Sequence, residues 1–162
     1  MPNFASTSTR TNLQQNVMLT GGDIGGNSGV RVQYCFYQNR YYGGDVYWHY
    51  KTNIPFSQWA MYNIEAVGYN YGNSLPIRCT WNFHISFGNG FYSVQYQNTY
   101  SGLTADRLYN SSDGYVVLVA TSNTAYYAGW SFNAYTTNAI PQGGFEIAML
   151  AVVQTSSNAN YY

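Results

Sequence analysis

The most constraining feature of the sequence is an alternation of apolar and polar residues over positions 77–87, IRCTWNFHISF. The odd positions carry the apolar side chains of Ile77, Cys79, Trp81, Phe83, Ile85 and Phe87. The even positions carry the polar residues Arg78, Thr80, Asn82, His84 and Ser86. Because successive side chains of a β-strand point to opposite faces, this pattern predicts a strand with one buried and one solvated face. Such strands are typical of antiparallel sheets.

A turn signal follows this strand directly. Asn89-Gly90 is typical of a two-residue hairpin turn, so we expect the chain to return as a strand over 91–99. Runs of β-branched and aromatic residues predict further strands at 30–37, 45–52, 62–71, 115–121, 126–137 and 144–156. The apolar content of the last run would also suit a helix. A strand is favoured there by the alternation of Phe145, Ile147, Met149, Ala151 and Val153.

The spacing of these runs predicts the fold class. About eight short strands follow one another, and no segment shows the helical period that a crossover helix needs. We therefore predict an all-β, antiparallel, jelly-roll-like β-sandwich with an extended N-terminal arm. Residues 1–29, rich in Ser, Thr, Asn, Gln and Gly, form the arm, and residues 30–162 form the sandwich head domain. Alternatively, the arm pairs as an edge strand within its own domain.

The charge of the chain excludes several classes of function. Its 162 residues include 6 Lys+Arg and 6 Asp+Glu, for a formal net charge of zero. A protein that neutralises phosphates needs an excess of basic residues, so we expect no nucleic-acid partner. No apolar run approaches the ~18 residues that span a bilayer, so we expect no membrane insertion. The N-terminus also lacks the apolar region of a secretory signal.

The cysteines and histidines form no recognisable metal motif. Cys35 and Cys79 are expected to be reduced thiols, although a bridge between adjacent strands would be geometrically possible. A zinc site made of these cysteines with His49 and His84 would lack the closely spaced ligand pairs typical of zinc sites. We expect no bound metal or other cofactor.

The acidic residues are equally uninformative about catalysis. Four aspartates lie in turn-like contexts, where their side chains cap turns: Asp23, Asp45, Asp106 and Asp113. A glycosidase needs two carboxylates facing one cleft. Glu65 and Glu146 are the pair available in predicted strands, and nothing in the sequence places them together. We therefore expect that the protein is not an enzyme.

The informative chemistry lies in the uncharged surface residues. The chain has 19 Tyr, 4 Trp and 8 Phe, together with 16 Gly and many Asn and Ser residues. Tyrosine provides stiff contact area, and Asn, Ser and Gly provide adaptable hydrogen bonds, which is typical of binding surfaces that work without charge. Aromatic faces beside amides also suit sugars, whose rings are apolar on one face and hydroxylated at the edge. Alternatively, many tyrosines fill subunit interfaces.

The expected binding residues lie in turns rich in Tyr, Asn and Gly, and they form three groups. The first is Asn39, Arg40, Tyr41 and Tyr42; the second is Tyr69, Asn70, Tyr71 and Asn73; the third is Asn123, Tyr126 and Tyr127.

Three phrases carry a resemblance to a known family. The stretch 48–79 contains Lys51, Thr52, Asn53, Ile54 and Pro55, followed by Met61, Tyr62, Ile64, Gly68, Tyr69, Tyr71 and Gly72. The other two phrases are YNSSDGYVVLVA at 109–120 and SSNANYY at 156–162. In this order the phrases resemble the C-terminal head domains of marine and cyanobacterial phage tail-fibre proteins. The resemblance covers roughly residues 30–162 and includes no catalytic signature.

The resemblance implies a homotrimeric, β-rich virion protein that is assembled in the host cytoplasm and takes part in host attachment. Its partners would be its own copies, other virion proteins through residues 1–29, and a host-surface glycan or protein. Those heads commonly end long fibre chains, whereas here a short arm precedes the head. The family supplies no ligand residues that transfer to this chain.

Two further hypotheses remain open. The same fold could decorate a capsid or tail tube without a receptor role, with the arm pinning the subunit to its neighbours. It could also be a free lectin-like carbohydrate-binding module that is unrelated to virions.

Overall fold

A computed structural model describes the chain over residues 46–72, 74–86, 90–100, 102–122, 128–136 and 149–162. It also gives the backbone of four short strands closer to the N-terminus, β1 (Leu13–Gln14), β2 (Gly21–Ile24), β3 (Asn27–Val30) and β4 (Cys35–Gln38). Eight longer strands follow: β5 (Val46–Pro55), β6 (Ala60–Asn70), β7 (Leu75–Ser86), β8 (Gly90–Asn98), β9 (Thr104–Asn110), β10 (Tyr115–Ser122), β11 (Ala128–Thr136) and β12 (Met149–Thr155).

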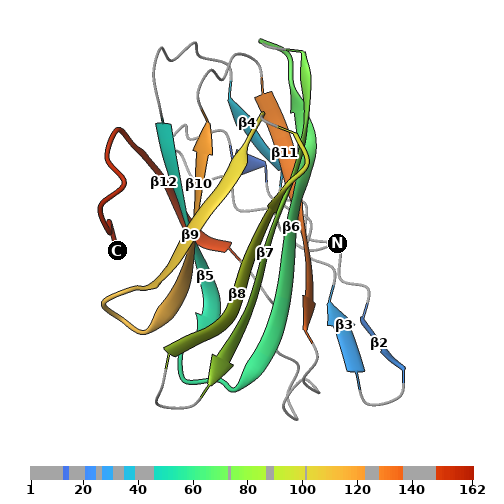
Figure 1. The fold of residues 1–162 in the computed structure, drawn as a ribbon, viewed down its shortest axis with the longest axis vertical. Coiled ribbons are helices and arrows are strands. Elements are labelled where there is room, and N and C mark those ends of the chain that lie inside the picture. The colour runs from blue at the N-terminus through green and yellow to red at the C-terminus, as the bar shows by residue number, and fades with distance from the viewer. Residues whose placement is uncertain are drawn as a thin grey trace.

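These strands form an antiparallel β-sandwich, which confirms the predicted fold class (Figure 1). The larger sheet has the strand order β1-β4-β11-β6-β7-β8, and the smaller sheet has the order β12-β5-β10-β9. The two sheets pack face to face, and β2 and β3 form a separate hairpin. Among the described residues there is no helix long and apolar enough to cross a membrane.

The strand order follows a Greek-key pattern. Strands β6, β7 and β8 form a meander, and β11 returns to lie beside β6 after the chain has passed through β9 and β10 of the other sheet. Because β5 pairs with β10 while β6 pairs with β11, two successive strands pair with two later ones in opposite sheets. This wrapped pairing is the jelly-roll-like element of the fold. The meander keeps β7 and β8 in the same sheet as β6.

The predicted hairpin between β7 and β8 is confirmed, but its turn is not the expected two-residue turn at Asn89-Gly90, because Gly90 is the first residue of β8. Strands β7 and β8 pair antiparallel, with Ser86 opposite Gly90. Gly90 has a φ of 99°, a conformation that glycine adopts at little steric cost. The alternation over 77–86 is also confirmed, because Ile77, Cys79, Trp81, Phe83 and Ile85 are all buried.

The strand β9 was not predicted from the sequence. It carries Asp106 and Arg107 side by side, which interrupts any apolar alternation. Its pairing with β10 shifts register between Val119 and Ala120, opposite these residues. This bulge lets the strand keep Ala105 and Tyr109 buried despite the polar pair between them.

The predicted alternation of the last strand is only partly correct. Met149 is buried, as expected, but a register shift follows between Met149 and Ala151. Leu150 is left exposed, and Val152, rather than Ala151 or Val153, packs against the core. A one-residue bulge therefore reverses the phase of the strand beyond Leu150.

The expected N-terminal arm contributes to the larger sheet. Strand β1 pairs with β4, with Leu13 opposite Phe36 and Gln14 opposite Cys35. This pairing matches the alternative in which part of residues 1–29 forms an edge strand of its own domain. The division of the chain into an arm and a head at residue 29 stays a prediction.

Aromatic side chains join the two sheets through the core. Trp81 of β7 donates its indole N–H to the Val119 carbonyl of β10 at 3.1 Å. Trp130 of β11 donates to the Tyr50 hydroxyl of β5, also at 3.1 Å. The ring of Phe132 packs edge-on against Tyr50, with centroids 4.9 Å apart. The core thus buries large rings and still pairs the indole N–H groups of both tryptophans.

Gly68 gives Trp130 the space that it needs. These two residues lie opposite each other in the β6–β11 pair. A Cβ atom added at Gly68 would lie 2.6 Å from the Cα atom of Trp130 and would also collide with the Gly129 carbonyl oxygen. The neighbouring backbone, not a movable side-chain tip, fills that space.

We expect Gly68→Ala to push β6 and β11 apart and to lower the free energy of unfolding by about 2 kcal/mol or more. For a chain of this length, that loss lowers Tm by about 4 °C or more in a thermal melt. Val67→Ala is the matched control, because the neighbouring Val67 side chain points outward and is exposed. An unchanged Tm for Gly68→Ala would show that the two strands can separate without loss.

Candidate functional site

The two sheets have very different outer faces. The outer face of the larger sheet displays most of the large apolar side chains that are exposed in the described structure: Trp59, Met61, Val67, Tyr69, Tyr92 and Tyr135. We call this surface, formed by the outward side chains of β6, β7, β8 and β11 together with Trp59, the open face. Exposed apolar groups concentrated on one face indicate an interaction surface.

One end of the open face carries a cluster of rings. Met61 of β6, His84 of β7 and Tyr92 of β8 lie opposite one another in the strand register. Trp59, which precedes β6, donates its indole N–H to Nε2 of His84 at 2.6 Å. We call Trp59, Met61, His84 and Tyr92 the aromatic corner. Trp59 is 67% exposed, so its ring is presented to solvent although its N–H is bonded.

A row of amides lies next to the aromatic corner. Asn63, Asn82 and Gln95 occupy neighbouring positions on β6, β7 and β8. Asn63 donates from Nδ2 to Oδ1 of Asn82 at 2.5 Å, which fixes the orientation of both amides. Tyr135 of β11 lies opposite Asn63 and is half exposed. Because strand positions two residues apart are about 7 Å apart, ring and amide groups form adjacent rows.

The open face has no net charge among its described residues. Its charged side chains are Glu65 and Arg78, and Nε of Arg78 donates to the Glu65 carboxylate at 2.8 Å. The pair therefore neutralises itself. A face of rings, amides and one closed ion pair suits an uncharged ligand with hydroxyl groups better than an anion.

The structure describes three of the turn residues that the sequence singled out. Tyr69 and Tyr71 are exposed, and Tyr69 lies on the open face at the opposite end of β6 from Met61. Asn70 is fully buried rather than exposed, and its Oδ1 accepts a hydrogen bond from the Gly72 backbone N–H. This buried amide shapes the turn after β6.

The remaining predicted binding residues lie outside the described part of the chain. They are Asn39, Arg40, Tyr41, Tyr42, Asn73, Asn123, Tyr126 and Tyr127. Sequence reasoning missed the aromatic corner because it searched the turns for binding residues. The signal was present in the polar half of the 77–87 alternation, which places His84 and Asn82 on the solvated face of one strand.

The outer face of the smaller sheet is covered by the chain itself. Residues 156–162, the C-terminal segment, cross this face and are held by hydrogen bonds from Arg107. Its Nε and Nη1 donate to the Oδ1 atoms of Asn158 and Asn160, each at 2.7 Å. The hydroxyl of Tyr109 accepts hydrogen bonds from the backbone N–H groups of Tyr161 and Tyr162.

A buried histidine lies beneath this segment. His49 is fully buried and contacts the Tyr109 hydroxyl through Nδ1 and Thr155 Oγ1 through Nε2, both at 3.2 Å. Because Tyr109 accepts two backbone bonds, its own proton is directed to Nδ1 of His49. Nε2 then carries the ring proton and donates to Thr155, which in turn donates to the Ser157 carbonyl. Burial lowers the pKa of His49 below 6.5, in agreement with this neutral form.

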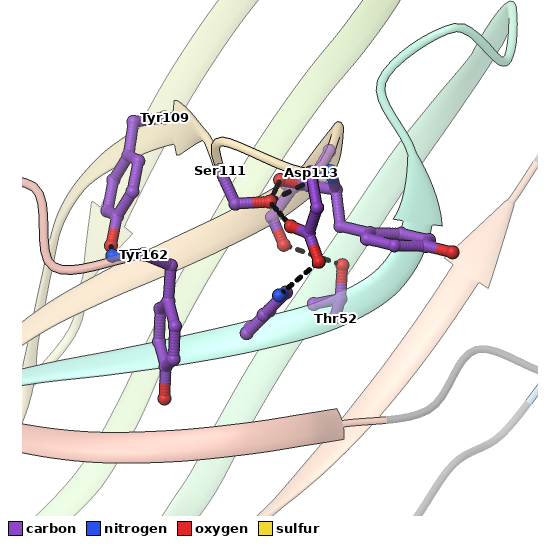
Figure 2. A network of polar contacts seen from close by, with 8 residues as sticks. Thr52, Tyr109, Ser111, Asp113 and Tyr162 are labelled. Carbon is purple, nitrogen blue, oxygen red and sulfur yellow. Dashed lines mark hydrogen bonds and ion pairs between the residues drawn. The ribbon is translucent and has the colours of Figure 1, made fainter.

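The C-terminal segment is one of the three phrases behind the family resemblance, and it meets the other two at the smaller sheet (Figure 2). Lys51 contacts the Asp113 carboxylate at 2.6 Å, and Thr52 donates to the Val116 carbonyl at 2.8 Å. Ser111 closes the turn by donating to Asp113 at 2.7 Å. The Lys51 ammonium also lies over the ring of Tyr162, 5.4 Å from its centroid. The hydrogen bonds from Lys51 and, to a smaller extent, from Ser111 to its carboxylate lower the pKa of Asp113. These contacts therefore fix the turn between β9 and β10 against the C-terminal segment.

The described residues among those considered for metal binding or catalysis lie apart. His49 lies on the outer side of the smaller sheet, His84 on the outer side of the larger sheet, and Cys79 in the core between them. No group of three potential metal ligands occurs among the residues that the structure describes. Glu65 is paired with Arg78, and Glu146 lies outside the described residues.

The alternative of a Cys35–Cys79 bridge is not compatible with the strand order. Strands β11 and β6 separate β4 from β7, so the two cysteines lie about 14 Å apart across the sheet. A disulfide needs Cα atoms within about 7 Å. Cys79 is a buried free thiol, and burial raises its pKa to about 12. This residue is therefore a core side chain with little thiolate character.

No family model, curated protein or solved structure matches this chain.

We expect the stability of the protein to depend on pH through His49. The folded state holds the neutral ring, whereas the unfolded chain takes up a proton as the pH falls below 6.5. The free energy of unfolding should therefore fall as the pH drops through this value, and it levels off below the lowered pKa of the folded state. Urea titrations at pH values between about 5 and 8, the range in which histidines titrate, measure this change in the free energy of unfolding.

Two variants test whether His49 is the cause. His49→Gln removes the titrating group and should flatten this part of the pH profile, whatever its effect on absolute stability. His84→Gln is the control, because His84 lies on the outer face of the other sheet. A profile that stays equally steep in His49→Gln would mean that another group is responsible.

Proposed function

We propose that the protein is a virion attachment protein of the tail-fibre-head type that binds a glycan on the host-cell surface. The observation that carries this proposal is the open face, where exposed rings adjoin oriented amides and the charges cancel. A sugar presents an apolar ring face and hydroxyl edges, which these two kinds of side chain complement.

The asymmetry between the two outer faces supports a binding role for the open face. The chain covers the outer face of the smaller sheet with its own C-terminal segment, where Tyr109 and Arg107 hold the backbone and amides. On the open face, Trp59, Met61 and Tyr135 are each at least half exposed. Exposing such large apolar side chains to water lowers the solubility of the protein, and a ligand-binding role explains why they are exposed.

The virion context of the proposal comes from the resemblance of residues 30–162 to phage tail-fibre heads. The homotrimeric state, the attachment to other virion proteins through residues 1–29 and the location in the virion stay predictions on the same basis. A closed trimer would bury matching patches of each subunit. The side chains of the arm lie outside the described residues.

The first test is whether the purified full-length chain binds to bacterial cells. We expect the fluorescently labelled protein to label a subset of strains in a panel, and periodate oxidation of the cells to abolish labelling. Periodate cleaves vicinal diols of sugars, whereas protease treatment of the cells should leave labelling intact. Flow cytometry measures both effects.

A second measurement separates attachment from decoration. Gold-labelled antibody on phage particles that carry this chain should mark a tail or fibre tip. Labelling spread over the capsid, together with no binding to any cells, would contradict the proposal and favour a decoration protein. Labelling of cells that is lost after protease but not after periodate would replace the glycan by a protein receptor.

A further inference from the structure

The aromatic corner has a geometry that singles it out within the open face. The rings of Trp59 and His84 lie 6.4 Å apart with planes tilted by 30°, and the rings of His84 and Tyr92 are also 6.4 Å apart, with planes tilted by 52°. The hydrogen bond between Trp59 and His84 fixes the two rings relative to each other. An indole N–H only donates, so Nε2 of His84 accepts and carries no proton in this arrangement. The corner is thus an ordered platform in which the rings of Trp59 and Tyr92 are exposed and that of His84 is half-buried.

The platform has the width of a short saccharide. Met61, His84 and Tyr92 occupy three neighbouring strands, so the row extends about 10 Å across the sheet. The row of Asn63, Asn82 and Gln95 runs parallel to it. A sugar ring that lies flat on the corner therefore brings its hydroxyl edge over the amides.

The amide row has hydrogen-bonding groups to offer such an edge. The bond between the two asparagines uses Nδ2 of Asn63 and Oδ1 of Asn82. It leaves the Asn63 carbonyl oxygen as an acceptor and the Asn82 amino group as a donor. A vicinal diol, which both donates and accepts, complements this pair.

The charges around the corner select against acidic sugars. The nearest charged side chains on the described open face are those of Glu65 and Arg78, which lie further along β6 and β7 and bind each other. A uronate or sialate carboxylate would lose its hydration on the platform without gaining a cation. An uncharged ring loses much less.

We propose that the aromatic corner is the primary subsite for a neutral oligosaccharide, with neighbouring sugar rings in contact with Trp59 and with Tyr92 and their hydroxyls bonded to Asn63 and Asn82. This inference deepens the proposed function and rests on it. It adds the place of binding and the class of sugar.

The tryptophans allow a direct test. Of the 4 Trp residues in the chain, Trp48, Trp81 and Trp130 are buried, and Trp59 is 67% exposed. Red-shifted emission and quenching by acrylamide therefore report on the corner. We expect at least one of cellohexaose, mannohexaose and chitohexaose to protect this emission from acrylamide in a saturable way. A hexamer of galacturonic acid is the charged comparison and should not protect it.

Alanine variants locate the subsite by isothermal titration calorimetry with the neutral hexamer that binds. Trp59→Ala and Tyr92→Ala should each weaken binding about tenfold or more, as expected for a central aromatic contact. Tyr100→Ala is the matched control and should stay within about twofold. Tyr100 and Tyr92 are each 44% exposed, but Tyr100 follows the end of β8 and is not part of the open face. Equal Tm values would show that the variants fold.

Other outcomes would overturn the inference, and they show separately whether the proposed function fails as well. Cell labelling that is sensitive to periodate, with hexamer binding lost in Tyr69→Ala but kept in Trp59→Ala, would move the subsite and leave glycan attachment standing. Preference for the galacturonic acid hexamer would contradict a neutral ligand. Binding of none of the neutral hexamers would overturn the subsite, and the periodate assay would then decide whether glycan attachment fails with it.

Discussion

The arrangement of this sandwich depends on the aromatic contacts that join its sheets. Trp81 and Trp130 extend from the larger sheet and donate hydrogen bonds to the Val119 carbonyl and the Tyr50 hydroxyl of the smaller sheet. Buried polar atoms that lack a partner are costly, so these bonds fix the position of one sheet over the other as well as their separation. Since β7 and β11 are held in this way from the inside, their outward side chains form a firm surface.

The sequence phrases and the candidate site report on different parts of the molecule. Lys51, Asp113 and Tyr162, from the three phrases that resemble phage fibre heads, gather at the smaller sheet and fix a turn and the C-terminal segment. The rings of the aromatic corner lie on the larger sheet. For the attachment role proposed above, this separation would let the recognition surface change without loss of the fold.

Much of the fold follows from local patterns, and the site does not. The alternation at Ile77–Ile85 and the return of the chain in a hairpin depend on nearest neighbours in the sequence, so they were predictable, although the turn is not at Asn89-Gly90 because Gly90 pairs with Ser86. Strand β9 was hidden by Asp106 and Arg107, and the bulge at Leu150 reversed a phase that the alternation of β12 suggested. The aromatic corner depends on the register that sets Met61, His84 and Tyr92 opposite one another. Three separate strands supply the residues of this corner, and the sequence of any one strand does not reveal how it pairs with the other two.

The cancelled charge of the open face has a consequence for the conditions in which it can work. Attraction between opposite charges is screened over about 3 Å at 1 M salt, so a surface that bound an anionic ligand through cations would bind it weakly in concentrated salt. Stacked rings and amides act through short contacts that dissolved ions leave intact. With Glu65 and Arg78 already bound to each other, attachment through this face would be nearly independent of salinity, from dilute to concentrated water.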